Sequence, residues 1–158
     1  MEIERKWVLD TAPSGLDQHP SQHFEQGYLA IDPAGAEVRV RRKDGVKSVL
    51  TVKTGSGLVR GEEEWEIANF DALWPLTEGR RVEKVRHLVA LEGGLTAEVD
   101  VYAGPLDGLL TAEIEFPSET AARTFSPPPW LGEEVTGDAT YANQSLATLS
   151  SAPGRRPG

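Results

Sequence analysis

Charged and apolar side chains alternate with a period of two along most of this chain, and this alternation limits the folds that it can adopt. In residues 36–43, for example, Arg39 and Arg41 share one parity, and Val38 and Val40 share the other. Successive side chains of a β-strand point to opposite faces of a sheet, so each such segment predicts a strand with one charged and one apolar face. Eight segments are predicted as strands: residues 2–9, 24–30, 36–43, 48–53, 59–67, 82–91, 95–102 and 110–116.

Short turn sequences separate several of these segments, which favours antiparallel hairpins. Asp44-Gly45 and Gly93-Gly94 are dipeptides typical of tight turns. Helices are predicted only at three places, namely residues 69–79, residues 119–125 after a Ser118 cap, and residues 141–149. We therefore expect one domain over residues 1–150, followed by a disordered tail at 151–158 that is rich in Pro, Gly and Arg.

The composition argues against several classes of protein. A chain of 158 residues without cysteine has the size of one domain and cannot form disulfides or thiolate metal sites. Its net charge of −9 argues against binding to nucleic acid or to an anionic membrane through the whole surface. No stretch approaches the roughly 20 apolar residues of a membrane span, and the first residues lack the apolar region of a signal peptide. A cytoplasmic protein is therefore expected.

The sign of the charge differs from strand to strand, which an ordinary solvated sheet face does not explain. Acids dominate one set of segments, as at Glu62 and Glu64, and bases dominate another, as at Arg39 and Arg41. For any single strand, a solvated charged face opposite an apolar core face remains the simpler alternative. However, the planar fork of arginine matches phosphate oxygens, and acids that face bases suit a complex of metal and polyphosphate. The pattern therefore indicates a polyanion site that includes a divalent cation.

The order of these motifs resembles that of the CYTH, or triphosphate tunnel metalloenzyme, superfamily. Glu2, Glu4 and Lys6 form an ExExK motif, and further matching segments follow in the order of the family. These segments are residues 26–29, 38–41, 50–53, 62–66, 83–86, 97–101, 112–115 and 130–138. The last of them is similar to a segment of short bacterial inorganic triphosphatases. The resemblance implies an all-β fold with a few peripheral helices, in which a closed eight-stranded antiparallel β-barrel forms a tunnel with its charged face inside.

The resemblance also implies roles for the inward charges. The acids expected on the metal side are Glu2, Glu4, Glu62, Glu64, Glu98, Asp100, Glu113 and Glu115. The cations expected to bind phosphate are Lys6, Arg39, Arg41, Lys53, Arg60, Lys84 and Arg86. Oxygen ligands select hard cations, so Mg²⁺ or Mn²⁺ is the expected cofactor. A carboxylate, Glu2 or Glu4, is expected to activate the attacking water; Lys84 is the alternative base, and Tyr28 could assist it.

The expected activity is hydrolysis of a small-molecule triphosphate, preferably tripolyphosphate, to pyrophosphate and phosphate. The enzymatic alternatives are a class IV adenylate cyclase and a thiamine, nucleoside or RNA 5′-triphosphatase, and the non-enzymatic alternative is a polyphosphate-binding module. Trp7 and Trp65 fall on the parity opposite the charges, and no inward aromatic cluster is expected to stack on a base, which favours an inorganic substrate. Assembly into a homodimer is left open.

Overall fold

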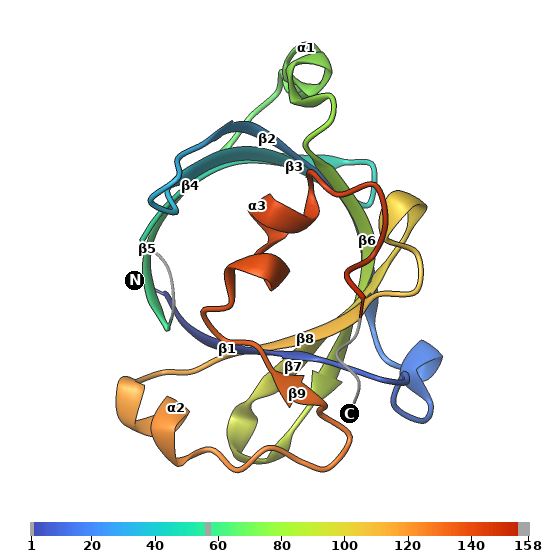
Figure 1. The fold of residues 1–158 in the computed structure, drawn as a ribbon, viewed down its shortest axis with the longest axis vertical. Helices are drawn as coiled ribbons and strands as arrows, with labels where there is room; N and C mark the ends of the chain where they lie inside the picture. The colour runs from blue at the N-terminus through green and yellow to red at the C-terminus, as the bar shows by residue number, and fades with distance from the viewer. Residues whose placement is uncertain (1, 56–57, 155–158) are drawn as a thin grey trace.

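The strands close into a ring, which Figure 1 shows end-on. The computed structural model describes residues 2–55 and 58–154. Neighbouring strands follow the order β5-β4-β3-β2-β6-β7-β8-β1, every pair is antiparallel, and an additional pairing of β1 with β5 closes the ring. The strands are β1 (Glu2–Val8), β2 (Ser21–Ile31), β3 (Glu37–Lys43), β4 (Lys47–Thr54), β5 (Val59–Glu66), β6 (Arg81–Ala90), β7 (Thr96–Tyr102) and β8 (Leu110–Glu115). The predicted closed eight-stranded antiparallel barrel is confirmed.

The predicted strand limits agree closely with the observed ones. The largest difference is at β2, which begins at Ser21 rather than at residue 24. A ninth strand, β9 (Glu133–Glu134), was not predicted; it pairs with Trp7 and Val8 of β1. Two residues are too short a segment to show an alternation, so the pattern that located the other strands carries no signal there.

The apolar parity of β1, β7 and β8 forms a core on the outside of the ring. Trp7, Val99 and Ile114 are buried together there, and α2 (Glu119–Thr124) packs over them (Figure 1). As predicted, the Ser118 side chain caps α2, because its Oγ accepts a hydrogen bond from the Ala121 amide over 3.0 Å. This outer core orients the opposite, charged faces of the same strands into the ring.

The predicted helix at 69–79 is divided into two short elements. They are α1 (Phe70–Leu73) and the 3-10 helix η2 (Trp74–Thr77), which has Pro75 in its first turn. Gly27 of β2 lets η2 approach the barrel, since a Cβ at this position would lie 2.5 Å from Oγ1 of Thr77. The remaining short helices are η1 (Leu16–Gln18), η3 (Glu92–Gly94), η4 (Gly104–Leu106) and η5 (Ala139–Tyr141). Within the described residues, none of the helices has the length and apolar character needed to cross a bilayer.

The C-terminal segment lies inside the outline of the ring. Figure 1 shows α3 (Asn143–Leu146) within the circle of strands, whereas a peripheral helix at 141–149 was expected. Leu146 is fully buried against Tyr28 and Tyr102, two aromatic side chains from β2 and β7. Ala152 packs against the same cluster, and residues 155–158 of the predicted disordered tail lie outside the described residues. The end of the chain therefore fills part of the barrel and leaves a smaller space for a ligand.

Candidate active site

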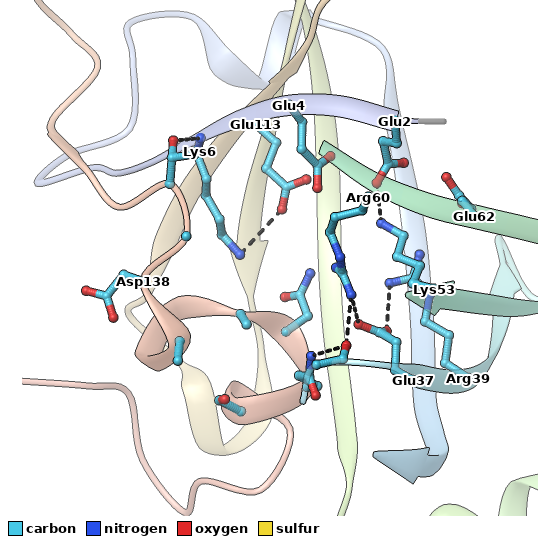
Figure 2. A pocket seen from close by; sticks show the side chains of 18 of the residues that line it. Glu2, Glu4, Lys6, Glu37, Arg39, Lys53, Arg60, Glu62, Glu113 and Asp138 are labelled. Atoms are coloured by element: carbon cyan, nitrogen blue, oxygen red, sulfur yellow. Dashed lines mark hydrogen bonds and ion pairs between the residues drawn. The ribbon is translucent and has the colours of Figure 1, made fainter. Parts of the chain in front are cut away.

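A cavity of about 570 Å³ opens into the barrel, and its walls are mostly charged. The inward faces of the strands form most of the wall, and the turn at 31–35 and the segment 135–145 form the rest. Figure 2 shows acids of β1 and β8 on one side and the C-terminal segment opposite them. The volume is in the range of small-molecule sites. The lining includes Glu2, Glu4, Lys6, Arg39, Arg41, Lys53, Arg60, Glu62, Arg86, Glu98, Glu113 and Glu115.

Four carboxylates form an acidic wall of this cavity, namely those of Glu2 and Glu4 on β1, Glu62 on β5 and Glu113 on β8. Burial and the neighbouring Glu113 raise the pKa of Glu4 to about 9. A hydrogen bond with Glu2, together with burial, raises the pKa of Glu62 to about 7. Glu4 therefore retains its proton at neutral pH when no cation is present, because burial and the neighbouring acids oppose its ionisation. Burial opposes ionisation of Glu113 as well, but Lys6 and Arg86 outweigh it and hold the pKa of Glu113 well below its usual range. A divalent cation bound beside Glu4 would displace its proton.

The acidic wall fits a metal that is shared with the substrate better than one enclosed by protein. Within residues 2–55 and 58–154, no group of three carboxylate or imidazole side chains converges closely enough to hold a metal ion. Mg²⁺ usually keeps several waters and takes one or two carboxylates, together with phosphate oxygens of the substrate. Glu4 and Glu113, which interact directly, would supply such a pair.

The opposite wall is cationic, and most of its cations are paired with acids. Lys53 Nζ lies 2.6 Å from Glu2 Oε1. On β6, the guanidinium of Arg86 contacts both carboxylate oxygens of Asp100, at 2.9 and 3.0 Å, and Glu98 at 2.8 Å. These pairs neutralise part of the positive charge before any ligand arrives.

Arg41 on β3 is the exception. Among the described residues it has no carboxylate within ion-pair distance; its Nε donates to Oε1 of Gln26 over 3.0 Å, and its guanidinium lies 4.5 Å from the Phe24 ring. Burial, Arg39 and Arg86 lower the pKa of Arg41 to about 10, which leaves the group a cation at neutral pH. The neighbouring Nε of Arg39 is a buried donor without an acceptor in the described structure. Unpaired buried donors and charge are costly, so this corner is suited to an anion.

Four of the predicted site residues do not line the cavity. Lys84 and Asp100 are fully buried behind it as an ion pair of 2.8 Å, and Tyr28 is fully buried as well. Burial, opposed by Asp100, lowers the pKa of Lys84 to about 7. Glu64 is exposed at the end of β5, where its carboxylate accepts a hydrogen bond from Thr51 over 3.2 Å. The alternation along the strands identified the sheet face on which each of these side chains lies, but not whether the side chain reaches the cavity.

Lys6 and Arg60 line the cavity but are held by backbone carbonyls. Lys6 Nζ donates to the Tyr141 carbonyl over 2.6 Å and lies 3.4 Å from Glu113. Arg60 donates to the carbonyls of Gly55 and Gly35. These contacts attach the C-terminal segment and the turn at 31–35 to the cationic wall.

Two inward side chains that hold these groups were missed, and so were the backbone carbonyls of the C-terminal segment. Glu37, 4% exposed, lies 3.1 Å from Arg60 and 3.6 Å from Arg39, and its parity with Arg39 was a usable signal. Gln26 was included in a matching segment without a role. The role of the C-terminal backbone carbonyls could not be predicted from the sequence, because their position depends on how the chain enters the barrel.

The sequence predicted no inward aromatic cluster that could stack on a base, but two aromatic side chains do share the parity of the charges. Phe24 packs beneath the guanidinium groups of Arg41 and Arg86, and Tyr102 lies 5.5 Å from Lys84 Nζ. These aromatic rings are buried under the charges, however, and none of the described residues that line the cavity is aromatic. Trp65, on the opposite parity, is 54% exposed on the outside.

Two curated relatives align with most of the length of this chain. A curated relative from Nitrosomonas europaea, named inorganic triphosphatase, is 47% identical over 149 residues, which are 92% of this chain and 96% of the relative. A relative from Acetivibrio thermocellus with the same name is 43% identical over 149 residues, which are 92% of this chain and 92% of the relative. No protein-family model matches the chain.

Solved structures agree with these relatives. The crystal structure of the inorganic triphosphatase NE1496 has a TM-score of 0.71 and 44% identity, covering 98% of this chain and 97% of the other. The more distant structure of HpAC1 from Hippeastrum, 20% identical, covers 78% of this chain and 83% of that one with a TM-score of 0.56, and it shares the fold.

A closed antiparallel barrel that sets carboxylates against arginines across its lumen is the architecture of the CYTH, or triphosphate tunnel, enzymes. Within that superfamily, the chain belongs to the inorganic triphosphatase family.

Proposed function

We propose that this protein hydrolyses tripolyphosphate to pyrophosphate and phosphate with the help of Mg²⁺ or Mn²⁺. The observation that carries the proposal is the unpaired Arg41 beside the free Arg39 donor, across the cavity from Glu4 and Glu113. A partly buried cation without a counter-ion favours an anion, and two neighbouring acids favour a cation. A metal-bound polyphosphate supplies both charges at once. The names of the close relatives support the same substrate.

The basic residues would hold the phosphate chain and stabilise its charge during the reaction. Arg41 and Arg39 would bind non-bridging oxygens of a phosphoryl group, with Lys53 beside them. When bound, the metal would neutralise charge on the phosphate oxygens. Water attacks a terminal phosphorus, the new P–O bond replaces the P–O bond to pyrophosphate, and a protein base takes the proton of the water.

Glu4 and Lys84 are candidates for this base. The position in the cavity favours Glu4, and the lowered pKa favours Lys84. Glu4 lines the cavity and has a pKa raised to about 9, so it would be an ionised base only after a cation displaces its proton. Lys84 has its pKa lowered to about 7 but is fully buried behind Asp100. Lys84 would therefore need a small opening of the wall, whereas Glu4 would need the metal.

Nucleotide substrates receive less support. Adenine is usually bound in an apolar or aromatic slot with a few placed polar groups. The lining of this cavity includes small residues such as Pro33, Ala34 and Ala142, and none of the described lining residues is aromatic. The cyclase and nucleoside triphosphatase alternatives therefore lack a site for the base.

The test is a phosphate-release assay with tripolyphosphate, pyrophosphate, ATP, GTP and thiamine triphosphate, each with Mg²⁺, Mn²⁺ or EDTA. We expect rapid release from tripolyphosphate with either metal and none with EDTA. Glu4→Gln should abolish turnover and keep the fold, because the side chains are nearly isosteric. Binding of tripolyphosphate without release would indicate a polyphosphate-binding module, and cyclic AMP formed from ATP at an equal rate would indicate a cyclase.

A further inference from the structure

Gln26 occupies an unusual position for a polar side chain. It is fully buried in β2, directly opposite Arg41 of β3 in the antiparallel register. Its Oε1 accepts from Arg41 Nε over 3.0 Å, and its Nε2 donates to the Tyr28 hydroxyl oxygen over 2.8 Å. The orientation of the amide follows from chemistry, because Arg41 can only donate and the acceptor oxygen must therefore face it.

The contact holds one edge of the arginine and leaves the other free. Nε of Arg41 is taken by Gln26, whereas its two terminal nitrogens make no hydrogen bond to any of the described residues. Arg41 lines the cavity, so these two nitrogens are the ones available to a ligand. Two parallel N–H donors match two oxygens of one phosphoryl group.

The neutrality of Gln26 distinguishes Arg41 from its neighbours. Arg86 has Asp100 at the corresponding cross-strand position, and Lys53 forms an ion pair with Glu2. A glutamate at position 26 would occupy nearly the same volume and would pair with Arg41. The amide instead supplies an acceptor without a charge.

We propose that Gln26 is a positioning residue that orients Arg41 toward the substrate phosphate while leaving the positive charge of Arg41 unneutralised. The proposal rests on the proposed function, since it concerns how the same site attracts tripolyphosphate. It assigns to the buried amide a part in substrate affinity, with no contact to the substrate itself.

The decisive variant is Gln26→Glu, which should change stability and affinity in opposite directions. The new carboxylate would pair with Arg41, so the melting temperature of the substrate-free protein should stay equal or rise. The affinity for tripolyphosphate, measured as KM with Mg²⁺, should weaken by about tenfold or more, because one unit of attracting charge is lost. If Gln26 served only packing, its substitution would lower the melting temperature. Stability and substrate affinity would then not change in opposite directions.

Two further variants complete the experiment. Gln18→Glu makes the same chemical change at an exposed position of η1 and should alter neither quantity. Gln26→Met keeps the bulk but removes the acceptor, so it should lower the melting temperature, weaken tripolyphosphate binding and leave the charge of Arg41 intact.

The proposal is overturned if Gln26→Glu keeps the wild-type KM, which would mean that the charge of Arg41 does not attract the substrate. It is also overturned if Gln26→Glu lowers the melting temperature, as the substitution of a residue that serves only packing would. A wild-type KM in Gln26→Met would remove the orienting role. The proposed function is judged separately, by the wild-type protein. If that protein binds tripolyphosphate without releasing phosphate, the dissociation constants from calorimetry replace KM in the same comparison of variants.

Discussion

Two pairs of cations face the same lumen, from β3 and from β6, and their surroundings differ. On β6, Lys84 and Arg86 both contact Asp100, which is fully buried. On β3, Arg41 has a neutral partner, and Arg39 lies 3.6 Å from Glu37 and has a buried Nε without an acceptor among the described residues. Both pairs look alike along the sequence, as basic residues two positions apart.

The difference comes from the neighbouring strands. The antiparallel register places Asp100 of β7 opposite Arg86, whereas β2 and β4 place Gln26 and Thr51 opposite Arg41 and Arg39. Cross-strand neighbours are the closest side chains on a sheet face, so they decide which charges are neutralised. Asp100 therefore neutralises part of the charge of the β6 pair, whereas no acid lies directly opposite either member of the β3 pair.

The largest expected effect is on stability, from the β6 side. Asp100→Asn leaves two buried cations without their shared counter-ion, so the free energy of unfolding should fall by about 3–5 kcal/mol. Urea denaturation measures this. Glu115→Gln, which changes an exposed acid on β8, is the matched control and should have little effect. Equal stability of the two variants would remove the distinction between the β3 and β6 pairs.

On the β3 side the effect should fall on catalysis. Arg41→Ala should lower kcat/KM for tripolyphosphate by about 100-fold, as expected when a charged donor to the transferring group is lost. Its free energy of unfolding should not fall as that of Asp100→Asn does, because no buried acid loses its partner. Steady-state kinetics and urea denaturation on one preparation provide both values, with the exposed Arg123→Ala as control. Near-native kcat/KM would contradict the assigned role.

The pH dependence of kcat tests whether Lys84 exchanges its proton. A base with a pKa lowered to about 7 is deprotonated above that pH, so kcat should rise as pH increases and should fall by about fivefold from about pH 7 to about pH 6. Lys84→Arg retains a cation beside Asp100 but cannot release the proton, so its kcat should be low at every pH. If the acid limb near pH 7 persists in Lys84→Arg, the base is a carboxylate such as Glu4.

The smallest effect is expected at Arg60, a third kind of cation in the same lumen. Arg60 donates to the carbonyls of Gly35 and Gly55 and to Glu37, so much of its capacity is already used. Arg60→Ala should raise KM for tripolyphosphate about threefold and leave kcat within about twofold, the scale of a single hydrogen bond. A loss as large as that of Arg41→Ala would show that Arg60 leaves its carbonyls when substrate binds.

Sequence reasoning was successful where a local rule applies. Alternation located the eight barrel strands and their charged faces, and the resemblance supplied the closure of the barrel, which periodicity alone does not contain. Depth along the strand was not predictable: Glu62 lines the cavity, whereas Glu64, two residues later on the same face, is exposed. Phe24 and Tyr102 share the parity of the charges but pack beneath them, and only the assembled lumen determines which side chains are covered.

The closure of the barrel has a consequence for synthesis. β1 lies between β8 and β5, so the strand made first must wait for residues 110–115 before its principal pairing can form. At translation rates of about 5–20 residues per second, that delay is roughly 5–20 s. During this time Trp7 and Val8, both buried in the finished protein, have no partner strand. The nascent chain therefore exposes these two apolar side chains until the segment that forms β8 has been made.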